Sequence, residues 1–359
     1  MRLLFTVALL SLLPTLVEAG NPAGEIPAPT GRRIVAPDAR LELLFTRQVP
    51  IEGGLTEGAA VAPDGSIYFS DILRGTDKGM ILRFDPKTKQ TTVFAEDSGK
   101  SNGLIFDREG RLLACEGADH GGRRISRWDV KTRQRTTLAD NYQGKKFNAP
   151  NDLCVDAAGR IYFSDPRYLG DETRELEHRA VYRIDPDGTV HEVTHEVVKP
   201  NGIAVSTDGK RLYVANHDNG TDKIDPDAPP PPQGLMNVVW FRLAEDGTVQ
   251  GQPKTLVDFG EKKGCDGMCV DEQGRIYLAV RDAARPGVMV VNRRGKEVAF
   301  IPTGPAGQSA ADPKNPPVGL PSNVEFGIGE EAHVLYVTVD TSLYRIPLKV
   351  KGHHVQYVP

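Results

Sequence analysis

Five oxygen-bearing side chains recur at one place in a repeated motif of the sequence. Each stands eight residues before the glycine of a predicted tight turn. The five are Glu57, Asn102, Asn151, Asn201 and Asp266, and the glycines are Gly65, Gly110, Gly159, Gly209 and Gly274. Carboxylate and amide oxygens are the ligands that Ca²⁺ prefers, whereas Zn²⁺ and other transition metals normally recruit His or Cys. The set predicts a divalent cation site, with Ca²⁺ first and Mg²⁺, Mn²⁺ or Zn²⁺ as alternatives.

Ordinary turn chemistry is the competing interpretation of these residues. Asp and Asn are common at strand entrances because their side chains bond to the local backbone. That explains any one of the five, but less well five in register whose two carboxylates, Glu57 and Asp266, balance the charge of a divalent ion. We therefore expect the five side chains to converge, with Asn323 of a weaker sixth motif as a candidate sixth member.

The elements that must position these residues are β-hairpins. Segments 57–71, 102–116, 151–165, 201–216 and 266–280 each read as a short strand, a turn ending in glycine and a second apolar strand, and 323–340 is a weaker copy. A second pair of strand-like runs follows, at 80–95, 125–139, 180–194, 237–250, 287–301 and 342–348. Four strands repeated six times predict an all-β fold, a six-bladed β-propeller with four antiparallel strands per blade and the metal in its central channel.

The N-terminal part of the sequence adds further expectations. Residues 1–19 have the layout of a signal peptide, with Arg2, an apolar run too short to span a bilayer and a small-residue cleavage signal; an uncleaved membrane anchor is the alternative. Residues 20–39, rich in Pro, Gly and Ala, read as a flexible leader, and 40–359 as the propeller domain. The run 40–46 has no hairpin partner and is expected to close the ring as the outer strand of the last blade. The mature protein is predicted to be secreted or periplasmic, without membrane attachment.

Composition limits the function classes. The 359 residues carry a net charge of −4 and no basic run, which disfavours a nucleic-acid partner. The four cysteines are sparse, and Cys154 and Cys269 occupy the same place in two different repeats. We therefore expect buried free thiols rather than disulfides, and no zinc site among them.

A second polar series ends the second strand of each hairpin. Its members are Asp71, Glu116, Asp165 and Asn216. Antiparallel geometry returns the second strand to the face where the first began, so these groups could contact a substrate at the same mouth. The alternative is that they are solvated polar strand ends.

The motifs T-E-G, P-N-D, P-N-G and D-G-M, each followed by a D-x-x-G-type turn, resemble the family of senescence marker protein, gluconolactonase and luciferin-regenerating enzyme over residues 40–348. The resemblance implies a divalent metal, often Ca²⁺, held by Glu57, Asn151, Asn201 and Asp266. It also gives Asp266 the role of general base or of the carboxylate that positions water. Ala149 stands where sugar-lactone members often have a substrate-contacting arginine.

The resemblance implies a gluconolactonase-like hydrolase that opens a small-molecule lactone or ester. The metal would polarise the carbonyl, and Asp266 would position or deprotonate water. Substrate contacts are expected from Asn102, Asn151, Glu116, His120 and Asp165, and His120 and His217 are candidate proton carriers. The alternatives are an organophosphate or phosphotriester hydrolase, and a non-catalytic propeller whose calcium is structural. The oligomeric state stays open.

Overall fold

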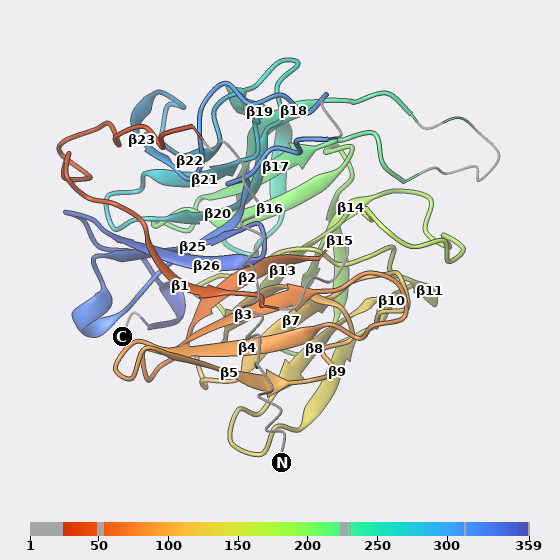
Figure 1. The fold of residues 1–359 in the computed structure, drawn as a ribbon. Helices are drawn as coiled ribbons and strands as arrows, with labels where there is room; N and C mark the ends of the chain where they lie inside the picture. Colours follow the sequence, from red (N-terminus) through yellow and green to blue (C-terminus); the bar gives the residue numbers. More distant parts are fainter. Residues whose placement is uncertain (1–23, 49–53, 223–228, 230, 312–313, 358–359) are drawn as a thin grey trace, which may run out of the picture.

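Six four-stranded antiparallel sheets form a ring around a central channel (Figure 1). The computed structural model describes residues 24–48, 54–222, 229, 231–311 and 314–357. Blade 1 contains β2 (Leu55–Val61), β3 (Ile67–Ile72), β4 (Met80–Asp85) and β5 (Gln90–Ala95), and blade 2 contains β6 (Ser101–Phe106), β7 (Leu112–Glu116), β8 (Arg124–Trp128) and β9 (Arg135–Ala139). Blade 3 contains β12 (Leu153–Val155), β13 (Ile161–Asp165), β14 (Ala180–Ile184) and β15 (Val190–Thr194). The predicted propeller is confirmed.

The other three blades follow the same order. Blade 4 contains β16 (Pro200–Val205), β17 (Arg211–His217), β18 (Met236–Leu243) and β19 (Val249–Asp258), and blade 5 contains β20 (Cys265–Val270), β21 (Ile276–Val280), β22 (Gly287–Val291) and β23 (Glu297–Pro302). Blade 6 contains β24 (Pro321–Phe326), β25 (Val334–Val339), β26 (Ser342–Pro347) and β1 (Glu42–Thr46). A small hairpin of β10 (Asn141–Tyr142) and β11 (Lys145–Lys146) and two 3₁₀ turns, Gly329–Glu331 and Val355–Tyr357, complete the described elements.

The hydrophobic core lies between the blades. Each of six buried clusters is built mainly from two neighbouring sheets. Between blades 1 and 2, for example, Tyr68 contacts Phe94 and Phe106 with ring centroids 5.1 and 5.2 Å apart, and Phe94 contacts Trp128. Because each sheet must bury both faces, it packs against a neighbour on either side, and the packing continues until the ring closes.

Glycines let the inner strands approach one another at the axis. A Cβ on Gly58 would lie 2.1 Å from the carbonyl oxygen of Asn102 in the next blade, and one on Gly202 would lie 2.2 Å from the carbonyl oxygen of Asp266. No side chain fits at either place, since real Cβ atoms do not approach other atoms so closely. The glycine that follows most of the predicted ligands is therefore a packing requirement of the channel.

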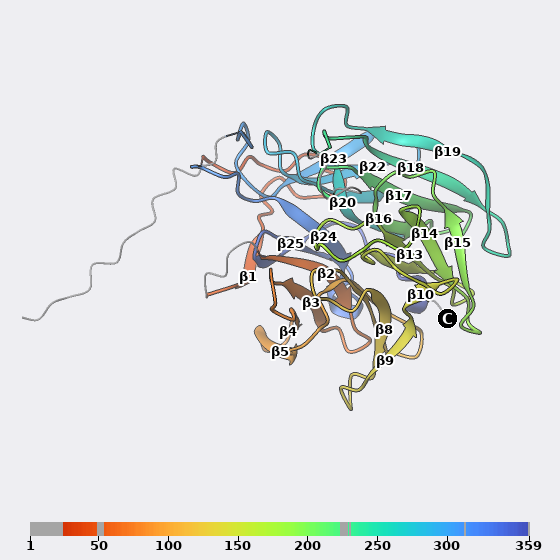
Figure 2. The same cartoon turned by 90° about the vertical axis from the view of Figure 1, so that its right-hand side faces the viewer.

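The first described strand closes the ring. Strand β1 pairs antiparallel with β26, with Glu42 opposite Arg345 and Thr46 opposite Ser342. Figure 1 shows β1, in red, beside the blue strands of blade 6, and Figure 2 shows the same neighbourhood from the side. The predicted closure by residues 40–46 is confirmed, and it covers the edge of the last sheet that would otherwise offer unpaired backbone groups.

The segments flanking the propeller also pack on it. Ile34 and Val35 are buried in the cluster between blades 5 and 6, and Thr30 bridges to Phe300, so the described part of the leader, residues 24–39, lies against the ring. The predicted signal peptide lies outside the described residues. Among those described, no helix has the length and hydrophobicity needed to cross a bilayer.

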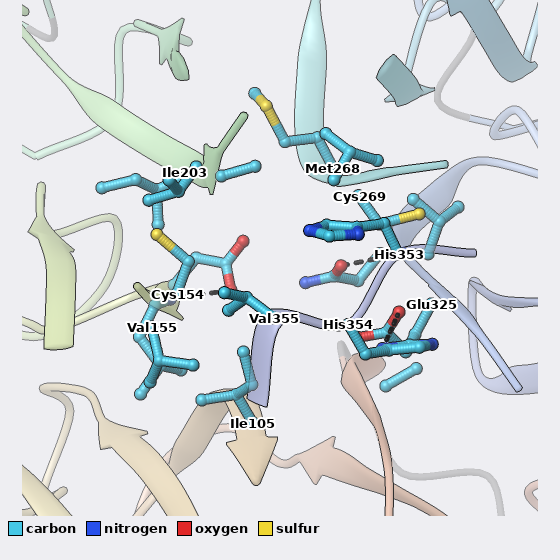
Figure 3. A pocket seen from close by; sticks show the side chains of 18 of the residues that line it. Ile105, Cys154, Val155, Ile203, Met268, Cys269, Glu325, His353, His354 and Val355 are labelled. Atoms are coloured by element: carbon cyan, nitrogen blue, oxygen red, sulfur yellow. Dashed lines mark hydrogen bonds and ion pairs between the residues drawn. The ribbon is translucent and has the colours of Figure 1, made fainter. Parts of the chain in front are cut away.

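The C-terminal segment fills the end of the channel where the inner strands finish. His353 and His354 lie among inner-strand side chains that include Cys154 and Cys269 (Figure 3). Nδ1 of His354 is 3.7 Å from a carboxylate oxygen of Glu325. All four cysteines are buried and free, as the sequence predicts.

Candidate functional site

A cavity of about 300 Å³ occupies the opposite end of the channel, where the inner strands begin. The five predicted ligands, which we call the ring residues, all line it: Glu57, Asn102, Asn151, Asn201 and Asp266. They come from blades 1 to 5 in order, because each stands at the entrance of an inner strand. The shared offset in the sequence thus corresponds to a shared height in the channel.

The two acidic ring residues, Glu57 and Asp266, are buried and have few positively charged neighbours. Glu57 is 4% exposed and Asp266 8%. Burial raises the pKa of Glu57 well above its usual range, and the nearby Asp266 carboxylate raises it further. Burial also raises the pKa of Asp266, and the Arg281 guanidinium, 3.4 Å from its Oδ2 atom, opposes that rise. Arg281 is the cation that acts on both buried carboxylates. A divalent ion bound between them would balance their remaining negative charge, and carboxylate oxygens suit such an ion.

The amide of Asn201 is held in one orientation. Its Nδ2 donates to the phenol oxygen of Tyr168 at 2.9 Å, which leaves Oδ1 as the free acceptor. The phenol in turn donates to the carbonyl oxygen of His217 at 3.0 Å. The ammonium of Lys199 lies 4.5 Å from the centre of the Tyr168 ring, a cation–π distance. Tyr168 therefore supports a ring residue of the neighbouring blade.

Asn323 does not join the ring residues. It lines the cavity at the other end of the channel, next to Asp152, and its Oδ1 accepts the backbone N–H of Val324 at 2.8 Å. Burial raises the pKa of Asp152 to about 7. The sixth blade thus contributes its amide one level below the ring.

The second polar series bonds to backbone N–H groups or to arginines and does not line the cavity. Asp165 accepts the N–H groups of Asn148 and Ala149 at 2.8 and 2.6 Å, just before Asn151. Asn216 likewise accepts the N–H of Lys199 at 3.0 Å, two residues before Asn201. The other two members pair with arginines: Glu116 with Arg124 at 2.8 Å and Asp71 with Arg47 at 2.9 Å. Each fixes a strand end or an approach to the channel.

The predicted substrate contacts therefore divide into two groups. Asn102 and Asn151 line the cavity, whereas Glu116, Asp165 and His120 are not among its lining residues in the described structure. His120 is exposed, and its backbone N–H donates to Glu172 at 2.9 Å. Glu116 and Asp165 are fully buried, so they are neither substrate contacts nor solvated strand ends in this arrangement.

The residue that follows the second series is the one that faces the cavity. Ile72, Gly117 and His217 follow Asp71, Glu116 and Asn216, Arg281 holds the equivalent place in blade 5, and all four line the cavity, whereas Pro166, which follows Asp165, does not. Successive side chains of a strand point to opposite faces, so a shift of one residue exchanges backbone support for cavity lining. Ile72 and Arg281 were not predicted as lining residues for this reason, and Tyr168 was not predicted because it lies on a loop without periodicity.

His217 is a neutral acceptor at the cavity wall. Its Nδ1 lies 3.0 Å from the carbonyl oxygen of Cys265, which can only accept, so Nδ1 carries the proton. Burial lowers the pKa of His217 to about 3, with Arg281 contributing in the same direction. Nε2 has no hydrogen-bond partner among the described residues and remains an unprotonated acceptor.

Comparisons with known proteins identify the family of the chain. The family model described as "SMP-30/Gluconolactonase/LRE-like region" matches residues 55–341. A gluconolactonase of Zymomonas mobilis is 30% identical over 262 residues, which cover 70% of this chain and 64% of that protein. The lactonase drp35 of Staphylococcus epidermidis is 26% identical, over 80% of this chain and 81% of its own.

A solved structure shows the same fold. The gluconolactonase of Xanthomonas campestris superposes with a TM-score of 0.70 and 26% identity, covering 91% of this chain and 98% of its own. The family model spans the ring residues and five of the six blades completely. The chain therefore belongs to the SMP-30/gluconolactonase/LRE-like family.

Proposed function

We propose that this protein is a calcium-dependent lactonase. The observation that carries the proposal is that five hard-oxygen side chains, two of them buried carboxylates, line one cavity. Glu57, Asn151, Asn201 and Asp266 would hold the ion. When bound, Ca²⁺ supplies positive charge that polarises the lactone carbonyl. The names of the similar proteins, gluconolactonase and lactonase, support this reaction class.

The chain's own residues supply the remaining roles. Asp266 accepts a hydrogen bond from the attacking water and takes up its proton. Arg281, 3.4 Å from Asp266, favours the ionised carboxylate that this role needs. The unprotonated Nε2 of His217 offers a second acceptor at the wall. Asn102, which is not among the four proposed ligands, is left to contact the substrate.

Export is a further part of the proposal. It rests on the signal-peptide layout of residues 1–19 and on their separation from the first described strand, β1 (Glu42–Thr46). A secreted or periplasmic site would also expose the protein to the high calcium concentrations that weak oxygen-ligand sites require.

Chelation tests the proposed function directly. The mature protein, residues 20–359, is treated with EDTA, dialysed and assayed on δ-valerolactone by pH-stat, before and after addition of Ca²⁺. We expect chelation to abolish hydrolysis and Ca²⁺ to restore it, and isothermal titration calorimetry to give about one site per chain. Full activity in EDTA, or no activity on any lactone under either condition, would contradict the proposal.

A further inference from the structure

We infer that the cavity selects lactones with an apolar substituent over polyhydroxylated sugar lactones. The inference rests on the proposed lactonase function and adds the substrate class. Three features of the cavity support it. One is its apolar wall, the second is that most polar lining groups already have hydrogen-bond partners, and the third is the position of the groups that do not.

Two blades supply the apolar wall. Blade 1 contributes Leu55, Ile72 and Leu73, and blade 3 contributes Ala149 and Pro150, just before β12, and Leu169, in the loop between β13 and β14. Tyr168, next to Leu169 in the chain, also lines the cavity. These apolar residues come from the same blades as the ring residues Glu57 and Asn151. A lactone whose carbonyl group points at the ring residues would therefore place its substituent against the apolar side chains.

The ammonium of Lys100 is not free to bind a substrate hydroxyl. Lys100 lines the cavity, but its Nζ donates to the carbonyl oxygens of Leu73 and Gly75 at 2.6 and 2.8 Å and to Asp119 at 3.2 Å. Three acceptors use the three hydrogens of an ammonium group. The same oxygen of Asp119, Oδ2, also accepts the backbone N–H of Gly75 at 3.1 Å, which leaves Oδ1 as an acceptor.

On the blade 4 loop the side-chain oxygens of Asn219 and Thr221 are likewise engaged, whereas Nδ2 of Asn219 has no partner among the described residues. Oδ1 of Asn219 accepts from Nζ of Lys199 at 2.9 Å and from the Thr221 hydroxyl at 2.7 Å. That hydroxyl also accepts from Lys199 at 3.1 Å. The phenol of Tyr168 is used by Asn201 and by the His217 carbonyl. To donate to a sugar hydroxyl, the Thr221 hydroxyl and the Tyr168 phenol would have to break existing bonds.

Apart from Oδ1 of Asp119 and Nδ2 of Asn219, the free polar groups lie beside the ring residues or at the rim. Arg281 and Nε2 of His217 stand next to Asp266 and Cys265, and Arg74 is at the exposed rim. They match a single ester group at the ring, not hydroxyls distributed over the whole substrate. A substrate hydroxyl that is buried without a hydrogen-bond partner weakens binding. Each buried methylene group raises the binding constant about fourfold, the factor that corresponds to its free energy of transfer out of water.

Three δ-lactones on the same six-membered ring test the inference. The calcium-loaded mature protein is assayed on δ-valerolactone, δ-decalactone and δ-gluconolactone, with the spontaneous rate of each subtracted. We expect kcat/KM for δ-decalactone to exceed that for δ-valerolactone at least tenfold, and δ-gluconolactone to be the poorest of the three. A δ-gluconolactone value above that of δ-decalactone overturns the inference while leaving the lactonase function in place. Hydrolysis of none of the three overturns both.

Matched leucine variants locate the effect. Leu169 is 41% exposed at the cavity, and Leu235, 60% exposed, precedes β18 and is not a lining residue. Leu169→Gln should lower kcat/KM for δ-decalactone three- to tenfold more than for δ-valerolactone, and Leu235→Gln should lower neither. Ile72→Thr, which keeps β-branching in blade 1, should repeat the Leu169→Gln pattern. Equal losses on both substrates, or none, would overturn the inference.

Discussion

The side-chain amide nitrogen of Asn201 donates to the phenol oxygen of Tyr168 at 2.9 Å, across the boundary between blades 4 and 3. The phenol can accept this bond because its own hydrogen goes to the carbonyl of His217 at 3.0 Å. The chain of bonds fixes which end of the amide faces the channel. An amide that presents nitrogen instead of oxygen cannot be a ligand to a cation, so Tyr168 is a positioning residue for the proposed calcium site.

Tyr168→Phe tests that relationship. The variant keeps the ring beside Lys199 but loses the hydroxyl, so the amide of Asn201 loses one of its two orienting contacts and keeps the other, with the Asp266 carboxylate. We expect the calcium dissociation constant, measured by titration calorimetry, to rise about 10- to 100-fold, as for other residues that orient a ligand. Tyr142→Phe, on the outer hairpin, is the control and should bind normally. An unchanged constant in Tyr168→Phe would show that the amide is held by other contacts.

Asp266→Asn separates the ligand role from the role in proton transfer. Asn retains an oxygen for Ca²⁺ and suits the strand entrance, but it removes one of the two carboxylates and cannot take up a proton. Calcium affinity should fall, and kcat at saturating Ca²⁺ should fall by a further 10²- to 10⁴-fold, the usual range for general acid–base catalysis. Recovery of full turnover at saturating Ca²⁺ would mean that Asp266 is a ligand alone and that His217 is the next residue to test.

Glu325→Gln should flatten the pH dependence of stability. Burial raises the pKa of Glu325 from 4.5 to about 8, while burial lowers that of its neighbour His354 to about 4, so the histidine is neutral in this range. The folded protein therefore keeps a proton that the unfolded chain loses above about pH 4.5. Stability should decrease as pH rises toward 8, with a slope of up to about 1.4 kcal/mol per pH unit from this group. Urea unfolding in EDTA between pH 5 and 8 measures the slope, and an equal slope in wild type and variant would exclude Glu325 as its source.

Processing of the chain tests the proposed export. Expression of the full sequence in a bacterial host with an intact secretion system should give a soluble product outside the cytoplasm whose first residue is near Gly20. N-terminal sequencing and fractionation make the measurement. A cytoplasmic product that begins at Met1, or one that remains with the membrane, would contradict the signal-peptide interpretation.

Repeat-level features of the molecule were predictable from the sequence. The offset between Asp266 and Gly274 recurs in four other hairpins, and because equivalent positions of a repeat occupy equivalent places in a ring, it located the ring residues in the cavity. The same logic identified residues 40–46 as the closing strand, since they had no partner of their own. Periodicity carries this information because it depends on many residues at once.

Details of one or two residues were not predictable in the same way. Asp165 was predicted to contact the substrate, but its carboxylate accepts two backbone N–H groups. In other blades the next residue along the strand lines the cavity. Successive side chains of a strand point to opposite faces of the sheet, so a prediction that is wrong by one residue places the side chain on the wrong face. Tyr168 follows Arg167, whose φ of 69° lies in the left-handed region, and such loop conformations leave no pattern in the sequence.

The pairing of β1 with β26 also determines when the ring can close during biosynthesis. Glu42 and Arg345, which are bonded at 2.8 Å, join a strand to one that is made about 300 residues later. Strand β1 must therefore wait without its partner while the intervening blades are made, and such long-range pairing folds slowly. A product that ends before residue 342 would lack its partner altogether. It would present an open sheet edge to other chains and be exposed to aggregation.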